Sequence, residues 1–210
     1  MTRVLLIGAT GLVGQSVLRQ ALQHPQVEQV IAPTRRPLPA HARLLNPVVD
    51  FDALPSDADW WAVDAVICTL GTTIKKAGSQ AAFRRVDHDL PLRVAQIALR
   101  HGAKAYALNS ALGADADSRV FYSRTKGGLE RDLQTLGYAS LTFVRPGLIG
   151  GEREESRLGE RIGVTLSQWL RALLPARYRV VPAERIAHCL LQAALAAEPG
   201  VRVVMSEDIG

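Results

Sequence analysis

Short apolar runs alternate with longer amphipathic stretches along this chain of 210 residues. An apolar run over residues 4–7 precedes a helical pattern over 12–23 and a β-branched run over 27–32. A strand, a helix and a second strand in this order predict a βαβ unit with two parallel strands. Similar apolar runs predict further strands over residues 47–50, 65–70, 105–110, 140–144 and 201–205. Apolar residues at helical spacing predict further helices over residues 89–100, 122–136, 161–174 and 183–196.

This alternation determines the expected fold class. We expect an α/β fold with a doubly wound, mostly parallel Rossmann sheet and helices on both faces. Because no repeat, low-complexity tract or linker divides the chain, residues 1–210 are expected to form a single domain. Residues 147–159 are polar and rich in glycine, which predicts a loop. Within the domain, residues 147–198 would form a small C-terminal extension on the substrate side.

Composition and charge narrow the classes of partner. Hydrophobic residues make up 48% of the chain and charged residues 21%, which indicates a globular protein with a sizeable core. The formal net charge is +5, but the arginines are dispersed and not interleaved with aromatic residues, so no nucleic acid is expected. No apolar run approaches the roughly 18 residues of a membrane span, and no signal peptide is recognised. We therefore expect a cytoplasmic protein that binds a small-molecule substrate and no membrane.

The cysteines and histidines indicate neither a disulfide nor a metal site. Cys68 and Cys189 lie far apart in apolar segments and are predicted to be reduced core residues. The histidines show no metal-ligand spacing, so no metal ion is expected.

A glycine-rich turn between the first strand and the first helix carries the firmest functional signal. The turn reads Gly8, Ala9, Thr10, Gly11, Leu12, Val13 and Gly14. Gly8 would permit the tight turn, Gly11 would let the backbone approach a pyrophosphate, and Gly14 would pack helix against strand. The pyrophosphate would meet free N–H groups and the positive end of the helix dipole. The turn thus predicts a dinucleotide site, and the alternative is an ordinary strand-to-helix connection.

The end of the second predicted strand indicates which dinucleotide is preferred. NAD enzymes usually place a carboxylate about 20 residues beyond the glycine turn, where it holds the ribose hydroxyls. This chain has Arg35 and Arg36 there, and guanidinium groups suit the 2′-phosphate of NADP. We therefore expect an NADP(H) cofactor in preference to NAD(H). The alternative is that both arginines are surface residues at a strand end.

Two later strand ends are expected at the same site. Asp50 and Phe51 close the third predicted strand and could flank the adenine, although a simple turn would look similar. The fourth predicted strand ends in a turn whose small residue would let the cofactor lie against the backbone. That turn consists of Leu70, Gly71 and Thr72.

Three side chains have the chemistry of a hydride-transfer site. Tyr122 and Lys126 are four residues apart in a predicted helix and would share one of its faces, and Ser110 ends the strand before it. A phenol with an ordinary pKa of about 10 is a poor base at neutral pH, so a neighbouring cation is needed to favour the phenolate. The set resembles the catalytic serine, tyrosine and lysine of the short-chain dehydrogenase/reductase family. By that resemblance Tyr122 exchanges a proton with the substrate, Ser110 hydrogen-bonds the substrate oxygen, and Lys126 also holds the nicotinamide ribose.

Longer stretches sharpen the resemblance. Residues 69–78, 83–87, 145–147 and 153–160 are similar to the HIV Tat-interactive protein 2-like group of atypical short-chain dehydrogenase/reductases. The resemblance implies that Pro146 and Gly147 lie near the nicotinamide, and that the segment around Arg153 borders the substrate.

The chain departs from that family pattern in two places. Asp87 and His88 stand at the helix start where many relatives carry a catalytic asparagine. The part that follows Arg145 is too short for the full substrate domain of the sugar-nucleotide epimerases.

The expected function is an NADP(H)-dependent oxidoreductase that reduces a small carbonyl compound, with the tyrosine as acid. Because some members of the group are regulatory, one alternative is a non-catalytic NADP-binding regulatory or scaffold protein. A second alternative is an NAD(P)-assisted epimerase or isomerase. In relatives, helices that flank the active site often pair between subunits, which is compatible with a homodimer.

Overall fold

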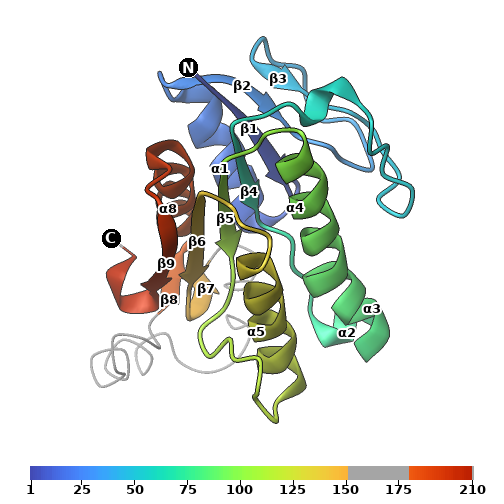
Figure 1. Cartoon of the computed structure of the whole chain (residues 1–210), viewed down its shortest axis with the longest axis vertical. Helices are drawn as coiled ribbons and strands as arrows, with labels where there is room; N and C mark the ends of the chain where they lie inside the picture. The colour runs from blue at the N-terminus through green and yellow to red at the C-terminus, as the bar shows by residue number, and fades with distance from the viewer. Residues whose placement is uncertain (151–179, 210) are drawn as a thin grey trace, which may run out of the picture.

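Seven parallel strands form the central sheet of the computed structural model, which describes residues 1–150 and 180–209 (Figure 1). They lie in the order β3-β2-β1-β4-β5-β6-β9, and every neighbouring pair is parallel. The strands are β1 (Thr2–Ile7), β2 (Val27–Ile31), β3 (Leu44–Leu45), β4 (Ala65–Cys68), β5 (Ala105–Asn109), β6 (Ser140–Arg145) and β9 (Gly200–Met205). The predicted Rossmann sheet is confirmed, with its order reversing between β1 and β4.

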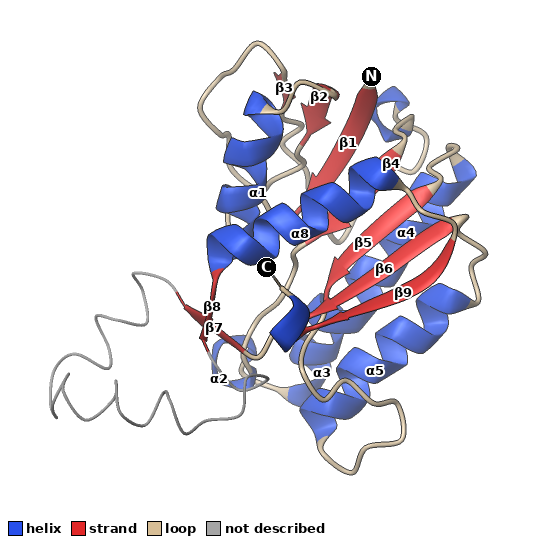
Figure 2. Cartoon of the chain, turned by 90° about the vertical axis from the view of Figure 1, so that its left-hand side faces the viewer, coloured by secondary structure: helices blue, strands red, loops and turns tan. Residues whose placement is uncertain are grey.

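Helices cover both faces of this sheet. On one face lie α1 (Leu12–Gln23) and α8 (Ala183–Ala196), and on the other lie α4 (Leu90–Arg100) and α5 (Phe121–Gln134) (Figure 2). Val4 and Leu6 of β1 pack with the first pair of helices, and the intervening Leu5 packs with the second pair. A strand buried on both faces needs an apolar side chain at every position, which is why these strands appear as uninterrupted apolar runs in the sequence.

A π-helical turn, Arg85–Asp89, joins α3 (Gln80–Arg84) to α4. Pro91 explains the wide turn, because it has no N–H for the carbonyl of Asp87 and its ring would collide with that carbonyl in a regular helix. The N–H of Leu90 instead donates to the carbonyl of Arg85, five residues earlier. The turn directs Asp87 and His88 inward, where they are 1% and 3% exposed.

The third strand differs from its prediction. Residues 47–50 contribute only an isolated bridge between Val48 and Thr34, and the strand itself is the two-residue β3. Asn46 interrupts the ladder, because its side-chain N–H group donates to the carbonyl of Ala32 at 2.5 Å in place of a backbone group. Pro47 follows with no N–H to donate.

The segment predicted as a loop over residues 147–159 begins with a strand. Here β7 (Leu148–Gly150) pairs in parallel with β8 (Val180–Pro182), so the loop prediction is wrong for these three residues. The rest of that loop, with Arg153, and the helix predicted over 161–174 lie outside the described residues. Neither α2 (Ile74–Ala77) nor α3 was predicted, because helices of one turn lack a periodic pattern. Among the helices that the structure describes, none is long and apolar enough to cross a bilayer.

Candidate cofactor and active site

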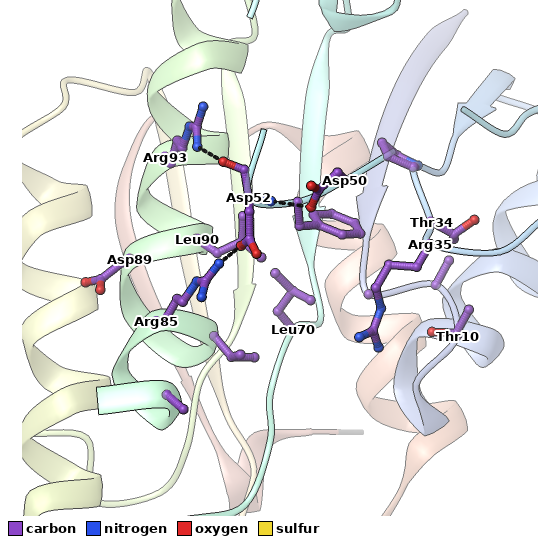
Figure 3. Close-up of a pocket in the computed structure, with 16 residues that line it drawn as sticks. Thr10, Thr34, Arg35, Asp50, Asp52, Leu70, Arg85, Asp89, Leu90 and Arg93 are labelled. Carbon is purple, nitrogen blue, oxygen red and sulfur yellow. Dashed lines mark hydrogen bonds and ion pairs between the residues drawn. The ribbon is translucent and has the colours of Figure 1, made fainter. Parts of the chain in front are cut away.

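Several residues predicted to bind a cofactor lie where the carboxyl ends of the central strands meet. A cavity of about 500 Å³ opens there, between the glycine turn, the segment after β2 and the π-helical turn (Figure 3). Its wall includes residues predicted to bind a cofactor, namely Gly8, Ala9, Thr10, Arg35 and Leu70. Open α/β sheets bind their ligands in this crevice, beside the point where the strand order reverses.

The glycine turn has a geometry suited to an anion. Gly8 has a φ of 93°, in the left-handed region that favours glycine, and its carbonyl accepts a hydrogen bond from the N–H of Gly11 at 2.9 Å. A Cβ atom on Gly14 would lie 2.0 Å from the Gly8 carbonyl oxygen, so a glycine is required for α1 to approach β1 this closely. Gly11 occupies the N-cap and has no side chain to cap the helix. The first-turn N–H groups of α1, at Leu12, Val13 and Gly14, could therefore bind a pyrophosphate.

The two arginines after β2 differ in position. Figure 3 shows the Arg35 side chain extending into the cavity toward the glycine turn. Arg36 is exposed and is not part of the cavity wall, and its carbonyl accepts a hydrogen bond from the Thr34 hydroxyl at 2.6 Å. Asp50 and Phe51 line the same cavity, and their predicted place beside the adenine stays a prediction. Of the two guanidinium groups, Arg35 is the one that a ligand in the cavity would meet.

The far wall of the cavity carries charged residues that the sequence did not single out. Arg85 pairs with the carboxylate of Asp52, and Arg93 donates a hydrogen bond to the Asp52 carbonyl at 3.2 Å (Figure 3). These contacts tie the segment after β3 to the π-helical turn and α4. Their signal in the sequence is weak, because each arginine is one of a dispersed set.

Tyr122 and Lys126 lie on the first two turns of α5 but differ in burial. Tyr122 is 37% exposed, and the centroid of its ring lies 5.7 Å from that of Phe83. Lys126 is 4% exposed, and its Nζ lies 2.7 Å from Oδ1 of Asp87. The other carboxylate oxygen of Asp87 accepts a hydrogen bond from the N–H of Thr72 at 2.9 Å. The phenol is thus open to a substrate, whereas the ammonium is held in a buried ion pair.

Ser110 contacts a buried acid on α5. Its hydroxyl donates a hydrogen bond of 2.5 Å to Oε1 of Glu130, which is buried on α5. Glu130 follows Tyr122 by eight residues, a rise of about 12 Å along a helix. The described contact of Ser110 is therefore with the middle of α5, and the predicted convergence of Ser110 with Tyr122 stays a prediction.

Arg145 completes the group around Glu130. Its Nε and Nη2 donate to the two oxygens of Glu130 at 3.0 and 2.5 Å, a bidentate arrangement. These hydrogen bonds raise the pKa of the Arg145 guanidinium, against the opposing effect of burial. The carboxylate missed by the sequence thus holds both Ser110 and Arg145, and its only sequence signal was its helical spacing of four from Lys126.

The remaining predicted residues lie beside this region. Gly71 adjoins Asp87, since a Cβ atom on Gly71 would lie 3.7 Å from Oδ1 of that residue. The Pro146 carbonyl accepts a hydrogen bond from the N–H of Leu112 at 2.9 Å, and the N–H of Gly147 donates to the Ser206 hydroxyl at 3.0 Å. These bonds hold the segment after β6 against the segments that follow β5 and β9, and its contact with a cofactor stays a prediction.

The cysteines and the possible metal ligands are dispersed. Cys68 and Cys189 are free thiols, the first buried and the second half-buried, and burial raises the pKa of each. In the two described ranges, no group of three or more histidine, cysteine or acidic side chains could hold a metal ion.

Comparison with known proteins identifies relatives in fungi. The chain is 36% identical over 171 residues to "Protein fmp52, mitochondrial" of Emericella nidulans, covering 77% of this chain and 73% of that protein. Further fungal relatives carry the same name. The expected cytoplasmic location is contradicted by this comparison, because these relatives are named mitochondrial proteins. No protein-family model matches the chain.

Solved structures share the fold. MoeE5, in complex with UDP-glucose and NAD, superposes with a TM-score of 0.71 at 19% identity, over 96% of this chain and 74% of MoeE5. An oxidoreductase of the short-chain dehydrogenase/reductase family from Burkholderia thailandensis superposes with a TM-score of 0.70 at 20% identity, over 98% of this chain and 92% of that chain. At these identities the likeness extends to the fold alone, which is a doubly wound Rossmann sheet.

Proposed function

The chain belongs to the FMP52 protein family, and from this premise we propose that it is an NADP(H)-dependent oxidoreductase of the short-chain dehydrogenase/reductase type. In this proposal it reduces a small carbonyl compound. The observation that carries the proposal is the cavity at the carboxyl edge of the sheet, lined by both the glycine turn and Arg35. An uncapped helix N-terminus suits the pyrophosphate, and a guanidinium in the same cavity suits the 2′-phosphate.

The residues at the other end of the proposed cofactor would carry the chemistry. A bound NADPH would supply the hydride. Tyr122 would donate its phenolic proton to the carbonyl oxygen, since its side chain is exposed at the start of α5. Lys126 would bind the cofactor ribose and stabilise the phenolate that remains on Tyr122. Ser110 would support the site through Glu130 rather than by direct contact with the substrate.

A second candidate function is an NADP-binding regulatory protein without turnover. The observation that favours it is the Ser110 hydroxyl, whose single proton is already donated to Glu130. An epimerase or isomerase would differ from both candidates, because it would use the cofactor without net NADPH oxidation.

Arg35 and its neighbour Arg36 provide a matched test of cofactor choice. Arg35→Ala should raise the Kd for NADPH by about ten- to a hundredfold, the loss of one charged hydrogen-bonding partner, and leave the Kd for NADH unchanged. Arg36→Ala should leave both values unchanged, because Arg36 does not line the cavity. Titration of each variant with both cofactors measures this. Equal affinity of the wild type for NADPH and NADH would contradict the NADP preference.

Tyr122→Phe separates the two candidate functions. With a carbonyl substrate found by screening NADPH oxidation, the variant should lose at least about a hundredfold in kcat, since the proton donor is gone. Its Kd for NADPH should stay at the wild-type value. Full turnover by the variant would rule out Tyr122 as the acid. Tight NADPH binding with no turnover on any carbonyl would favour the regulatory protein.

A further inference from the structure

Asp87 is a buried carboxylate that joins three parts of the proposed site. It belongs to the π-helical turn, its Oδ1 lies 2.7 Å from Nζ of Lys126 on α5, and its Oδ2 accepts the N–H of Thr72 after β4 at 2.9 Å. Gly71 is also near the carboxylate, since a Cβ atom built on Gly71 would lie 3.7 Å from Oδ1 of Asp87. The residue therefore links the lysine to the turn that the sequence places against the cofactor.

Stability alone does not account for this ion pair. Both side chains are almost fully buried, at 5% and 1% exposure. The desolvation of two charges offsets most of their attraction, and an apolar pair of similar volume is often as stable or more so. A buried pair at the edge of a ligand site is better explained by the geometry that it imposes.

The part of the chain that the structure describes leaves donors of Lys126 free for a ligand. An ammonium has three N–H donors, and within the described residues Asp87 is the one carboxylate in ion-pair distance of it. The contact with Asp87 fixes the direction of the Lys126 side chain, and among the described residues no second ion pair uses its other donors. Hydroxyl groups such as those of a ribose are suitable acceptors.

The π-helical turn is itself held on α5 by a second contact. His88 is buried, and its ring nitrogens lie 2.8 Å from a carboxylate oxygen of Asp89 and 3.0 Å from one of Asp132. Asp132 lies on α5, so the turn contacts that helix through two successive residues. The turn thus has two separate contacts with α5, and of these only the one at Asp87 involves Lys126.

We propose that Asp87 is a positioning residue, which sets the Lys126 ammonium and the Thr72 amide relative to each other and so prepares the subsite for the nicotinamide half of the cofactor. The inference rests on the proposed function. It implies that loss of the Asp87 carboxylate weakens one half of the cofactor site and not the other, because the adenosine half is bound at the glycine turn and Arg35.

Two ligands distinguish the halves of the site. NADPH contains both, whereas adenosine 2′,5′-bisphosphate has no nicotinamide. Asp87→Asn keeps the side-chain volume and an acceptor for the Thr72 N–H but removes the ion pair. Lys126 would then no longer be held where it donates to the cofactor. The Kd for NADPH should rise by about tenfold or more, the usual effect of losing one charged hydrogen bond to a ligand. The Kd for adenosine 2′,5′-bisphosphate should stay within about twofold of the wild-type value.

His88→Asn provides the matched control. It removes the neighbouring contact between the same turn and α5 but does not touch Lys126. It should lower thermal stability and leave the ratio of the two dissociation constants at the wild-type value. An equal change of that ratio in both variants would mean that Asp87 has a merely structural role, and it would overturn the inference.

A second pair of variants keeps the test decisive if Asp87→Asn does not fold. Lys126→Met alone and Lys126→Met with Asp87→Asn differ only in the carboxylate, and the double variant leaves no buried charge unpaired. If Asp87 acts through the lysine, both should have the same Kd for NADPH. A further loss of NADPH affinity in the double variant would overturn the inference.

Failure of the wild type to bind NADPH would overturn the proposed function and this inference together. Normal binding of NADPH by both the wild type and Asp87→Asn would overturn the inference alone.

Discussion

Buried carboxylates determine where the polar side chains at the carboxyl edge of the sheet point. Glu130 receives the Ser110 hydroxyl and both hydrogen-bonding groups of Arg145, and Asp87 receives Lys126. A buried carboxylate must be hydrogen-bonded or paired, since an unpaired charge in the interior carries a large desolvation cost. Each of these acids therefore sets the direction of the side chains that donate to it or pair with it.

Glu130→Gln should destabilise the protein. The amide cannot neutralise Arg145 and offers one acceptor where the carboxylate has two. Because Arg145 remains partly exposed, we expect a loss of about 2–3 kcal/mol, below the usual range for a fully buried pair. Urea denaturation followed by circular dichroism measures the change.

Glu184→Gln is the control for this substitution. Glu184 pairs with Arg19 on the surface, where both side chains are more than half exposed, so its loss should cost less than about 1 kcal/mol. Equal losses in the free energy of unfolding in the two variants would contradict the prediction that the buried Glu130 pair stabilises the protein more than the surface pair.

Elements differed in how far their sequence pattern determined them. The predictions for α1 and α8 agree with the structure at both ends, because each has a clear apolar stripe and is longer than two turns. The predicted 47–50 strand was misplaced, since the Asn46 side chain replaces a backbone partner in a way that no periodicity reports. The π-helical turn was also missed, although Pro91 signals it once the helix on either side is known.

Two adjacent glycines of α5 test how closely the loop before that helix packs against it. A Cβ atom on Gly127 would lie 2.2 Å from the backbone N of Ala116, whereas a Cβ on Gly128 would meet only the His88 ring at 3.7 Å. Gly127→Ala should therefore displace the loop and cost about 2 kcal/mol or more, in the range of overpacking. Gly128→Ala should be neutral or stabilise the helix by up to about 1 kcal/mol.

Thermal denaturation of both variants measures this difference in packing. Each substitution adds the same methyl group to the same helix, so intrinsic helix propensity cancels between them. If Gly127→Ala were as stable as Gly128→Ala, the loop would not pack on α5 as described.

At the scale of the whole molecule, the two apolar layers bury ionisable groups whose charged forms are disfavoured. Burial raises the pKa values of Tyr106 and Tyr138, which stack edge to face between the sheet and α4, and of the Cys68 thiol. In the unfolded chain these groups have ordinary pKa values of about 10 for tyrosine and 8.5 for cysteine. The unfolded state therefore releases protons first as the pH rises.

The free energy of unfolding should consequently fall above pH 8.5, and more steeply above pH 10, by at most about 1.4 kcal/mol per pH unit for each group. Tyr138→Phe removes one of these ionisable groups. It should make the fall of the unfolding free energy above pH 10 shallower by up to about 1.4 kcal/mol per pH unit. At neutral pH the variant should lose about 1 kcal/mol, because the Tyr138 hydroxyl donates to the Ala95 carbonyl at 2.7 Å. Urea denaturation at pH values from 7 to 11 measures both effects, and an unchanged alkaline slope would contradict the assignment.

The sequence by itself determined the fold class, most elements and the glycine turn, because these depend on local periodicity and on residues adjacent in the chain. The turn at Gly8, Gly11 and Gly14 needs only a strand before it and a helix after it, so its geometry was predictable. The tertiary structure alone decided which distant side chains meet. It put Ser110 on Glu130, Lys126 on Asp87 and Arg35 but not Arg36 in the cavity wall. Those pairings depend on where each strand ends beside α5 and on a turn widened by Pro91. A shift of either element by one residue would turn its side chains to another face and pair different groups.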